Sequence, residues 1–330
     1  MSFLSRAFAP NRARLAGVTV AHGAPSVARR CSRTGKACQP IELIGIRRTS
    51  QFEVGIHNKP TSSKGTQIVP RYGDFNIQDR VYAITGGGRG LGLSMADALV
   101  EAGAKVYCLD RLDTPSTNFN DSKRRASEHG GRLEYRKVDV RDTQTVNEIF
   151  ADIAARDKRL DGLVAAAGIN HLQSALDHTQ TALEDVMSIN YNGVFNTATA
   201  AARQMLHYES PGSMLLVASM SGLIANKGMT SPVYNSSKAA VIQLTRSLAM
   251  EWGRSGIRVN SLCPGHVVTP MVEMVFQKNP ASRAIWEAEN MLGRLAMPEE
   301  FRGCALFALS DASSFMTGST LVIDGGHTAW

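Results

Sequence analysis

The chain has 330 residues, of which 43% are hydrophobic and 20% charged, a composition typical of a folded globular protein with a sizeable core. Its net charge of +7 is uneven, because residues 1–75 carry 12 Lys and Arg against 3 Asp and Glu, whereas residues 76–330 carry 24 against 26. The body therefore lacks the positive field of a nucleic-acid binder, and no stretch approaches the ~18 uncharged apolar residues of a membrane span. We expect neither a nucleic-acid partner nor a membrane-embedded segment.

Residues 1–75 predict an N-terminal extension that is not part of the fold. The first fifty residues contain nine basic residues and a single acid, Glu42, and they are rich in Ser and Ala. An Arg-rich, Ser-rich and acid-poor N-terminus is typical of an organelle transit peptide. We therefore expect a mitochondrial protein. The alternative is a cytoplasmic protein with a disordered basic extension, or with a start codon placed too early.

Residues 76–330 alternate between short apolar runs and longer helical segments. The runs predict strands at Val81–Thr85, Lys105–Asp110, Arg132–Val138, Gly162–Ala166, Ser213–Ser219, Arg258–Leu262 and Thr320–Ile323. The segments between them predict helices, notably Leu91–Ala102, Leu183–Leu206 and Val233–Trp252. Strands that alternate with helices form a parallel sheet covered on both faces. The sequence predicts one α/β domain with a single doubly wound parallel sheet.

The cysteines indicate a reducing compartment. The five are Cys31, Cys38, Cys108, Cys263 and Cys304, and no two of them form a C-x-x-C pair. Two fall inside apolar runs, where a reduced and buried thiol is the ordinary outcome. We expect neither structural disulfides nor a metal site.

A glycine-rich turn joins the first predicted strand to the first predicted helix. Residues 85–92 read Thr-Gly-Gly-Gly-Arg-Gly-Leu-Gly. Glycines let the chain turn sharply and let a pyrophosphate approach the backbone, while the helix N-terminus offers free N–H groups. A plain tight turn is the alternative, but the strand before it and the helix after it favour a Rossmann-type dinucleotide site.

Asp110 ends the second predicted strand, 18 residues after Gly92. A carboxylate at that place accepts hydrogen bonds from a ribose 2′-hydroxyl and repels a 2′-phosphate, which favours NAD over NADP. Arg89 and Arg111 favour NADP, since either could pair with a phosphate. We expect NAD as cofactor, with NADP as the alternative.

Tyr234 and Lys238 lie four residues apart at the start of a predicted helix, so they share one face. A phenol with a pKa of about 10 is a poor base at neutral pH, but a neighbouring ammonium and a positive nicotinamide stabilise the phenolate. A surface tyrosine beside a lysine is the alternative. The position downstream of a nucleotide-binding half favours an acid–base pair.

Further motifs follow in a fixed order along the chain. Residues 85–92 read T-G-x-x-x-G-x-G, residues 234–238 read Y-x-x-x-K, and residues 264–269 read P-G-x-x-x-T. Asn190 opens an N-Y-N-G-V-F segment, and Ser219 opens S-M-S-G at the end of a predicted strand. With these motifs the chain resembles a classical short-chain dehydrogenase/reductase over roughly residues 76–330.

The resemblance implies roles for individual residues. Tyr234 is the proton donor or acceptor at the substrate oxygen, and Lys238 lowers its pKa and binds the nicotinamide ribose. Ser219 hydrogen-bonds the substrate oxygen, Asn190 positions a water in a proton relay, and Asp139 contacts the adenine. The implied cofactor-binding residues are Thr85, Gly86, Gly90, Leu91, Gly92, Asp110, Asp139, Gly168, Lys238, Pro264, Gly265, Val267 and Thr269.

Three details qualify the resemblance. Where the family often has N-N-A-G, residues 165–168 read A-A-A-G, so we expect the local hydrogen bonding to differ. Ser221 is a rival for the serine role, although the S-x-x-G spacing favours Ser219. Ser236 and Ser237 are interpreted as surface or packing residues.

The segment between Ser219 and Tyr234 resembles the fungal polyol dehydrogenase and ketose reductase branch, which acts on arabinitol or mannitol. We expect hydride transfer between NAD(P) and a secondary alcohol or ketone, with a polyol/ketose pair as substrate and with a homo-oligomer, dimer or tetramer, as the family implies. His171, Gln173 and His266 are candidate polar contacts to a polyol. Apolar residues that suit a hydrophobic secondary metabolite, steroid or lipid-like substrate instead are Met271, Met274, Phe276, Trp286 and Met291. A non-catalytic nucleotide-binding scaffold is the second alternative.

Overall fold

The computed structural model describes residues 72–330. The predicted N-terminal extension, residues 1–75, lies outside the described residues apart from its last four, three of which form the 3-10 turn Gly73–Phe75. Cys31 and Cys38 also lie outside them. The predicted boundary between residues 75 and 76 stays a prediction.

Seven parallel strands form one sheet in the order β3-β2-β1-β4-β5-β6-β7. They are β1 (Val81–Thr85), β2 (Lys105–Asp110), β3 (Arg132–Lys137), β4 (Gly162–Ala165), β5 (Gly212–Val217), β6 (Ile257–Pro264) and β7 (Thr320–Ile323). The predicted fold class is confirmed, and each predicted strand is present with its ends within two residues. The strand order reverses between β1 and β4, and in such sheets ligands bind outside the carboxyl ends at that point.

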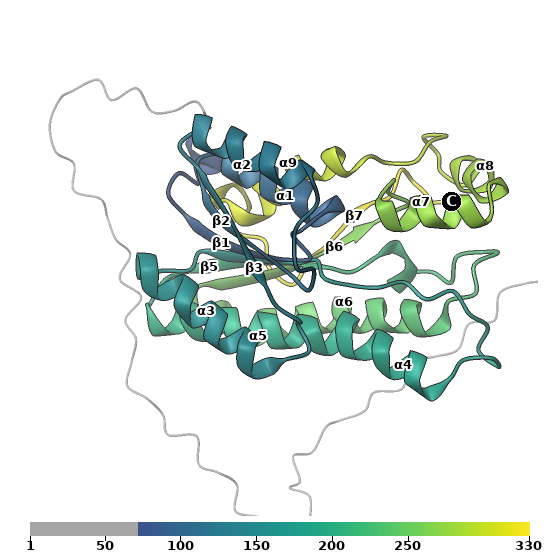
Figure 1. Cartoon of the computed structure of the whole chain (residues 1–330). Helices are drawn as coiled ribbons and strands as arrows, with labels where there is room; N and C mark the ends of the chain where they lie inside the picture. Colours follow the sequence, from purple (N-terminus) through teal and green to yellow (C-terminus); the bar gives the residue numbers. More distant parts are fainter. Residues whose placement is uncertain (1–71) are drawn as a thin grey trace, which may run out of the picture. The chain divides into compact units, whose positions relative to one another are not determined.

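Both faces of the sheet are buried, because successive strand residues point to opposite sides. In β1, Val81 and Ala83 pack into one hydrophobic core, and Tyr82 and Ile84 pack into the other. Figure 1 shows the two helical layers that these cores join to the sheet. Helices α1 (Gly90–Glu101), α2 (Asn118–Glu128) and α9 (Arg302–Leu309) cover one face, and α3 (Thr143–Asp157), α5 (Gly193–His207) and α6 (Pro232–Trp252) cover the other.

Three further helices follow the carboxyl ends of strands. They are α4 (Gln180–Met187), which comes after β4, and α7 (Pro270–Lys278) and α8 (Ala281–Ala288), which come after β6. Among residues 72–330, no helix combines the length and the hydrophobicity needed to cross a bilayer.

The predicted helix Leu183–Leu206 is interrupted in the structure. α4 ends at Met187, residues Ser188–Asn192 form a π-helical turn, and α5 begins at Gly193. A π turn adds a residue to one turn of the helix and rotates the side chains that follow, and such turns are frequent at functional sites. Here the turn contains Asn190, whose contacts are given below.

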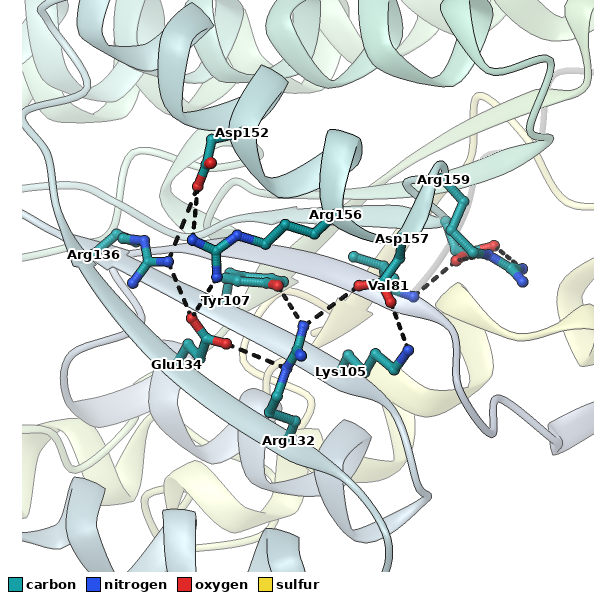
Figure 2. A network of polar contacts seen from close by, with 11 residues as sticks. Val81, Lys105, Tyr107, Arg132, Glu134, Arg136, Asp152, Arg156, Asp157 and Arg159 are labelled. Carbon is teal, nitrogen blue, oxygen red and sulfur yellow. Dashed lines mark hydrogen bonds and ion pairs between the residues drawn. The ribbon is translucent and has the colours of Figure 1, made fainter.

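A polar network fastens α3 to the β2–β3 edge of the sheet (Figure 2). Asp157 at the end of α3 pairs with Lys105 of β2 at 2.6 Å and with Arg132 of β3 at 3.4 Å. Glu134 of β3 pairs with Arg156 of α3 at 3.3 Å. These side chains are partly exposed, so each pair adds little stability, and the network serves to fix where α3 lies on the sheet.

The described cysteines carry free thiols, as predicted. Cys108 of β2 and Cys263 of β6 are buried, and Cys304 of α9 is half-buried. Burial raises the pKa of Cys263 and of Cys304 to about 11, so both stay protonated at neutral pH.

Candidate active site

The turn between β1 and α1 has the conformation that its glycines predict. Gly86 and Gly90 have φ values of 67° and 57°, in the left-handed region that side chains disfavour. A Cβ on Gly92 would lie 2.2 Å from the Gly86 carbonyl oxygen, so a larger residue would force the turn apart. The turn therefore depends on glycine at all three positions.

The N-terminus of α1 faces the segment that follows β6. A Cβ built on Gly90 would have Thr269 and Pro270 as its nearest neighbours, each 3.8 Å away. Arg89, at the N-cap, makes no side-chain hydrogen bond to the helix, so the first N–H groups stay available to an anion. Leu91 is half-buried and packs against the hydrophobic core that contains Tyr82 and Ile84, and this contact anchors the start of α1. This cradle fits the pyrophosphate of a dinucleotide.

Asp110, at the end of β2, lies beside the glycine turn. Its Oδ2 accepts a hydrogen bond from the Gly88 N–H at 3.1 Å, and its Oδ1 accepts one from the Leu112 N–H at 3.3 Å. A carboxylate fixed in this place fits hydrogen bonding to a ribose hydroxyl. Arg89 and Arg111 are both exposed, so the preference for NAD over NADP stays a prediction.

Residues 165–168 lie against Thr85 although the family's asparagines are missing. The Ala166 N–H donates to the Thr85 carbonyl oxygen at 3.1 Å, and the Ala167 N–H donates to Thr85 Oγ1 at 3.4 Å. A Cβ on Gly86 would lie 2.8 Å from the Ala167 nitrogen, which shows how closely the two segments approach. Backbone amides thus supply the contact between β1 and β4 at this point.

The segment after β6 brings the remaining predicted cofactor residues to the same edge of the sheet. Pro264 ends β6, and a Cβ on Gly265 would lie 2.6 Å from the Cα of Asp324, so that the chain after β7 packs directly on it. Val267 is buried, and Thr269 caps α7. This segment thus reaches the glycine turn, since Thr269 is a nearest neighbour of Gly90.

Asp139 lies after β3, where a contact to adenine is predicted. Its carboxylate pairs with Arg141 at 2.6 Å and accepts a hydrogen bond from the Arg141 backbone N–H at 3.0 Å. The guanidinium lowers the pKa of Asp139 below its usual range.

A cavity of about 340 Å³ next to Arg141 is lined by Tyr191 and Phe195, and it does not include the predicted catalytic residues.

Ser219 and Tyr234 meet beyond the carboxyl end of β5. Ser219 is 8% exposed and follows the strand, and Tyr234 lies in the first turn of α6. The Ser219 side chain lies close enough to the Tyr234 hydroxyl to influence its pKa. Burial raises the pKa of Tyr234, and the Ser219 side chain opposes that shift. The two side chains thus lie together at the carboxyl edge of the sheet, and their roles in catalysis stay a prediction.

Lys238 is buried one helical turn after Tyr234. Its Nζ lies 5.8 Å from the centroid of the Tyr234 ring and donates a hydrogen bond to the Val217 carbonyl oxygen at 2.9 Å. Burial lowers the pKa of Lys238 to about 8, so the ammonium form still predominates at pH 7. A Cβ on Gly168 would lie 3.3 Å from Asn190 Oδ1 and 3.5 Å from this Nζ, so Gly168 lies directly beside both side chains.

Asn190 is fully buried in the π turn and ties two segments to each other. Its Oδ1 accepts from the Ile169 N–H at 2.9 Å, and its Nδ2 donates to the Ile169 carbonyl oxygen at 3.0 Å and to Ser237 Oγ at 3.1 Å. Ser237 in turn donates to the Tyr234 carbonyl oxygen at 2.7 Å. The Asn190 side chain is therefore occupied in holding the chain after β4 against α6, and the predicted water relay stays a prediction.

Two further serines lie next to the predicted catalytic residues. Of the two alternatives for Ser237, a surface or a packing residue, the structure shows the second: its side chain is fully buried and connects Asn190 to the first turn of α6. Ser221, considered as a rival to Ser219, donates its backbone N–H to Ser219 Oγ at 3.1 Å and accepts a hydrogen bond from Asn226 Nδ2 at 2.6 Å. Ser221 therefore orients Ser219. The only sequence signal for Ser237 was its place three residues after Tyr234.

Replacing Asp110 is expected to change the cofactor preference. In Asp110→Asn the side chain keeps its shape and can still accept from the Gly88 N–H, but it no longer repels a 2′-phosphate. Because two charges about 4 Å apart interact by about 4 kcal/mol near a protein surface, we expect the NADP-to-NAD preference to rise about tenfold or more. Dissociation constants for both reduced cofactors measure this ratio. Asp113→Asn is the matched control, since Asp113 is exposed and pairs with Lys137, and an unchanged ratio in Asp110→Asn would contradict the assignment.

Comparison with known proteins agrees with this arrangement. A family model described as enoyl-(acyl carrier protein) reductase matches residues 86–328. The chain is 43% identical to a short chain dehydrogenases/reductase protein, notP′, of Aspergillus versicolor, over 82% of this chain and 100% of that protein. It is 37% identical to a galactitol 2-dehydrogenase of Rhizobium johnstonii over 78% of this chain and 98% of that protein.

Two further relatives extend the comparison. A ribulose-forming D-arabinitol 2-dehydrogenase of Scheffersomyces stipitis is 33% identical, over 80% of this chain and 98% of its own length. The crystal structure of a gluconate 5-dehydrogenase from Burkholderia cenocepacia, in complex with NADP and tartrate, superposes with a TM-score of 0.70 at 31% identity, over 78% of this chain and 98% of that one.

The glycine turn, the Ser219–Tyr234 pair and the buried Lys238 thus occur together in a chain whose similarity to these proteins extends over most of its length. The chain belongs to the short-chain dehydrogenase/reductase family, whose members are NAD(P)-dependent oxidoreductases of alcohols and ketones.

Proposed function

We propose that this enzyme interconverts a polyol and its ketose. The observation that carries the proposal is a pair of buried amide oxygens without a hydrogen-bond donor, Oδ1 of Asn170 and Oδ1 of Asn226. Asn170 follows Ile169, which is bonded to Asn190, and Asn226 is bonded to Ser221, so both belong to the loops that border the catalytic residues. A buried polar group without a partner costs about 1–3 kcal/mol, and a polyhydroxylated substrate supplies donors.

The similarity to dehydrogenases named for galactitol and D-arabinitol supports the same substrate class. His171 and Gln173 lie in the loop after β4 and are hydrogen-bonded to each other at 2.6 Å, so this loop also presents polar side chains. A substrate with several hydroxyl groups matches such a lining better than a hydrocarbon does.

The catalytic side chains account for the proton transfer. In the oxidative direction, the Tyr234 phenolate takes the proton of the substrate hydroxyl as the carbon–hydrogen bond breaks and the C–O bond becomes a carbonyl. Ser219 holds the substrate oxygen by a hydrogen bond, and the Lys238 ammonium stabilises the phenolate. A nicotinamide cofactor held by the glycine turn and Lys238 would supply the hydride chemistry, as acceptor in this direction and as donor in the reverse one.

A hydrophobic alcohol or ketone is the second candidate substrate, and one observation favours it. Met271 and Met274 of α7 and Met291 after α8 are 39%, 52% and 49% exposed, so an apolar surface borders the site. The relative with 43% identity carries the family name without a substrate.

Turnover by the full chain distinguishes these substrates. Absorbance of the reduced nicotinamide is followed with pentitols, hexitols and apolar alcohols, each with NAD and with NADP. Turnover of a pentitol or hexitol supports the proposal. Turnover of apolar alcohols alone would show that the substrate is a hydrophobic alcohol and not a polyol. Nucleotide binding without any turnover favours the non-catalytic scaffold.

The Asn170→Leu variant tests the role of the buried amide. We expect KM for the polyol to rise about tenfold, as for the loss of one buried hydrogen bond, while KM for an apolar alcohol stays the same or falls. The exposed Asn120, replaced by Leu in α2, is the matched control. A KM that rises equally for both substrates would argue against a polyol contact.

For the location of the protein, we propose mitochondria, supported by the basic, Ser-rich and acid-poor composition of residues 1–50. A fusion of residues 1–75 to a fluorescent protein is expected to accumulate in mitochondria. The control fusion carries the same residues with its arginines replaced by glutamine. Cytoplasmic fluorescence from the unaltered fusion would favour a basic extension without targeting function.

For the assembly, we propose a homo-oligomer. Leu183 of α4 and Phe195 and Leu206 of α5 are 38%, 43% and 47% exposed, so this pair of helices presents apolar side chains that a second copy could cover. Light scattering of the purified chain is expected to give a dimer or tetramer, and Phe195→Glu is expected to shift the mass toward the monomer. A monomeric wild type would contradict the prediction.

A further inference from the structure

Three potential metal ligands converge at the carboxyl edge of the sheet from distant parts of the chain. His266 follows β6, Glu289 follows α8, and His327 lies in the C-terminal turn after β7. One ligand atom of each residue lies within 4.8 Å of those of the other two. Within residues 72–330, no other group of three His, Cys, Asp or Glu side chains comes this close together.

Each of the two histidines has a buried ring nitrogen without a hydrogen-bond partner. Each residue is 8% exposed, and His266 Nε2 and His327 Nδ1 have no hydrogen-bond partner. Buried polar atoms are almost always paired, so two such atoms in neighbouring rings require an explanation. Glu289 is half-buried beside them and takes part in no ion pair among the described residues. An uncompensated carboxylate next to two unpaired imidazoles is an arrangement that a cation satisfies.

Neighbouring residues hold these ligands in place. The His266 ring stacks on Trp286 with a centroid distance of 4.2 Å and an interplanar angle of 4°. The rings of His266 and His327 lie 5.2 Å apart at 83°, so they do not stack on each other. The Asn290 side chain donates to the Trp286 carbonyl oxygen at 2.7 Å, which ties the end of α8 together. Orientation by such outer contacts is typical of metal ligands.

We propose that His266, Glu289 and His327 bind a divalent first-row transition-metal ion such as Zn²⁺. Two imidazoles and a carboxylate form a donor set that such ions prefer, and three protein ligands leave a coordination position open. The ion joins the segment after β6, the end of α8 and the C-terminal turn, and so it fixes the segment that borders the proposed substrate site. The proposal does not depend on the substrate class proposed above.

Metal binding by the full, tag-free chain tests the proposal without any measurement of activity. The protein is stripped with a chelator and titrated with Zn²⁺ by calorimetry and with Co²⁺ by visible absorption. We expect the wild type to bind one equivalent of Zn²⁺. We expect Glu289→Gln and His327→Asn to bind it at least about tenfold more weakly. Zn²⁺ is also expected to raise Tm of the wild type and not of these variants, since an ion that binds only the folded state stabilises it.

Glu287→Gln is the matched control, because Glu287 lies in the last turn of α8, two residues before Glu289, and pairs with Arg283 at 2.9 Å rather than joining the cluster. It is expected to bind like the wild type. Sites elsewhere, such as any formed by Cys31 and Cys38, contribute equally to all four proteins, so the differences between them report this cluster. Equal Zn²⁺ affinity in the wild type and in both ligand variants overturns the proposal. A wild type that binds no equivalent of Zn²⁺ tightly also overturns it.

Discussion

Tyr234→Phe is expected to lower kcat by about 10³-fold, within the 10²–10⁴-fold that acid–base catalysis contributes. The substitution removes the hydroxyl whose pKa Ser219 influences and keeps the aromatic ring in the first turn of α6. Because the proposed role of the tyrosine is at the substrate oxygen and not in the glycine turn, the dissociation constant for the reduced cofactor is expected to stay within about twofold. Steady-state kinetics and nucleotide fluorescence measure the two quantities separately.

Tyr208→Phe is the matched control for this substitution, since Tyr208 lies at the end of α5, away from the catalytic residues. It is expected to retain the wild-type kcat. Residual turnover of Tyr234→Phe close to the wild type would remove Tyr234 from the proton transfer. A loss of cofactor binding together with turnover would instead indicate that the substitution disturbs the fold.

Lys238→Met is expected to abolish turnover and to change how stability depends on pH. The pKa of Lys238 is lowered by burial from 10.5 to about 8, so between these values the unfolded chain binds a proton that the folded chain has lost. The free energy of unfolding of the wild type therefore rises with pH across this window, by on the order of 3 kcal/mol from this group. Below pH 8 the buried ammonium reduces stability relative to a neutral side chain.

The test compares the wild type with Lys238→Met at pH 7 and at pH 10.5 by urea unfolding without cofactor. The substitution also removes the hydrogen bond to the Val217 carbonyl oxygen, but this loss is common to both pH values and cancels in the difference. Lys123→Met, at an exposed position of α2, is the control and is expected to show no such pH-dependent difference. The same difference at both pH values in Lys238→Met would mean that Lys238 is not desolvated as the structure indicates.

Most of the fold could be predicted from the sequence because its signals are local. A strand buried on both faces is a short apolar run, and β1 with its five buried residues is a clear case. The turn at residues 85–92 is readable because its positive φ values and close approaches admit only glycine. Tyr234 and Lys238 are readable together because four residues make one helical turn.

The π turn at residues 188–192 could not be predicted in the same way. Residues 183–192 contain neither Gly nor Pro, so no helix-breaking residue marks this turn within the predicted helix Leu183–Leu206. The turn becomes visible only through the contacts of Asn190 with Ile169 and Ser237. Burial of Ser237 likewise depends on how α6 packs on its neighbours.

The sequence by itself thus determined the fold class and the dinucleotide turn and predicted the catalytic side chains, since each rests on residues that are close in the chain or follow in a recognisable order. Only the tertiary structure decided that Ser221 orients Ser219, that Ser237 holds Asn190, and that His266 meets Glu289 and His327. Parallel strands bring the residues that follow them to one edge of the sheet, whatever their separation in sequence. Which of those residues then touch depends on the packing of loops and helices at that edge, and no local pattern records it.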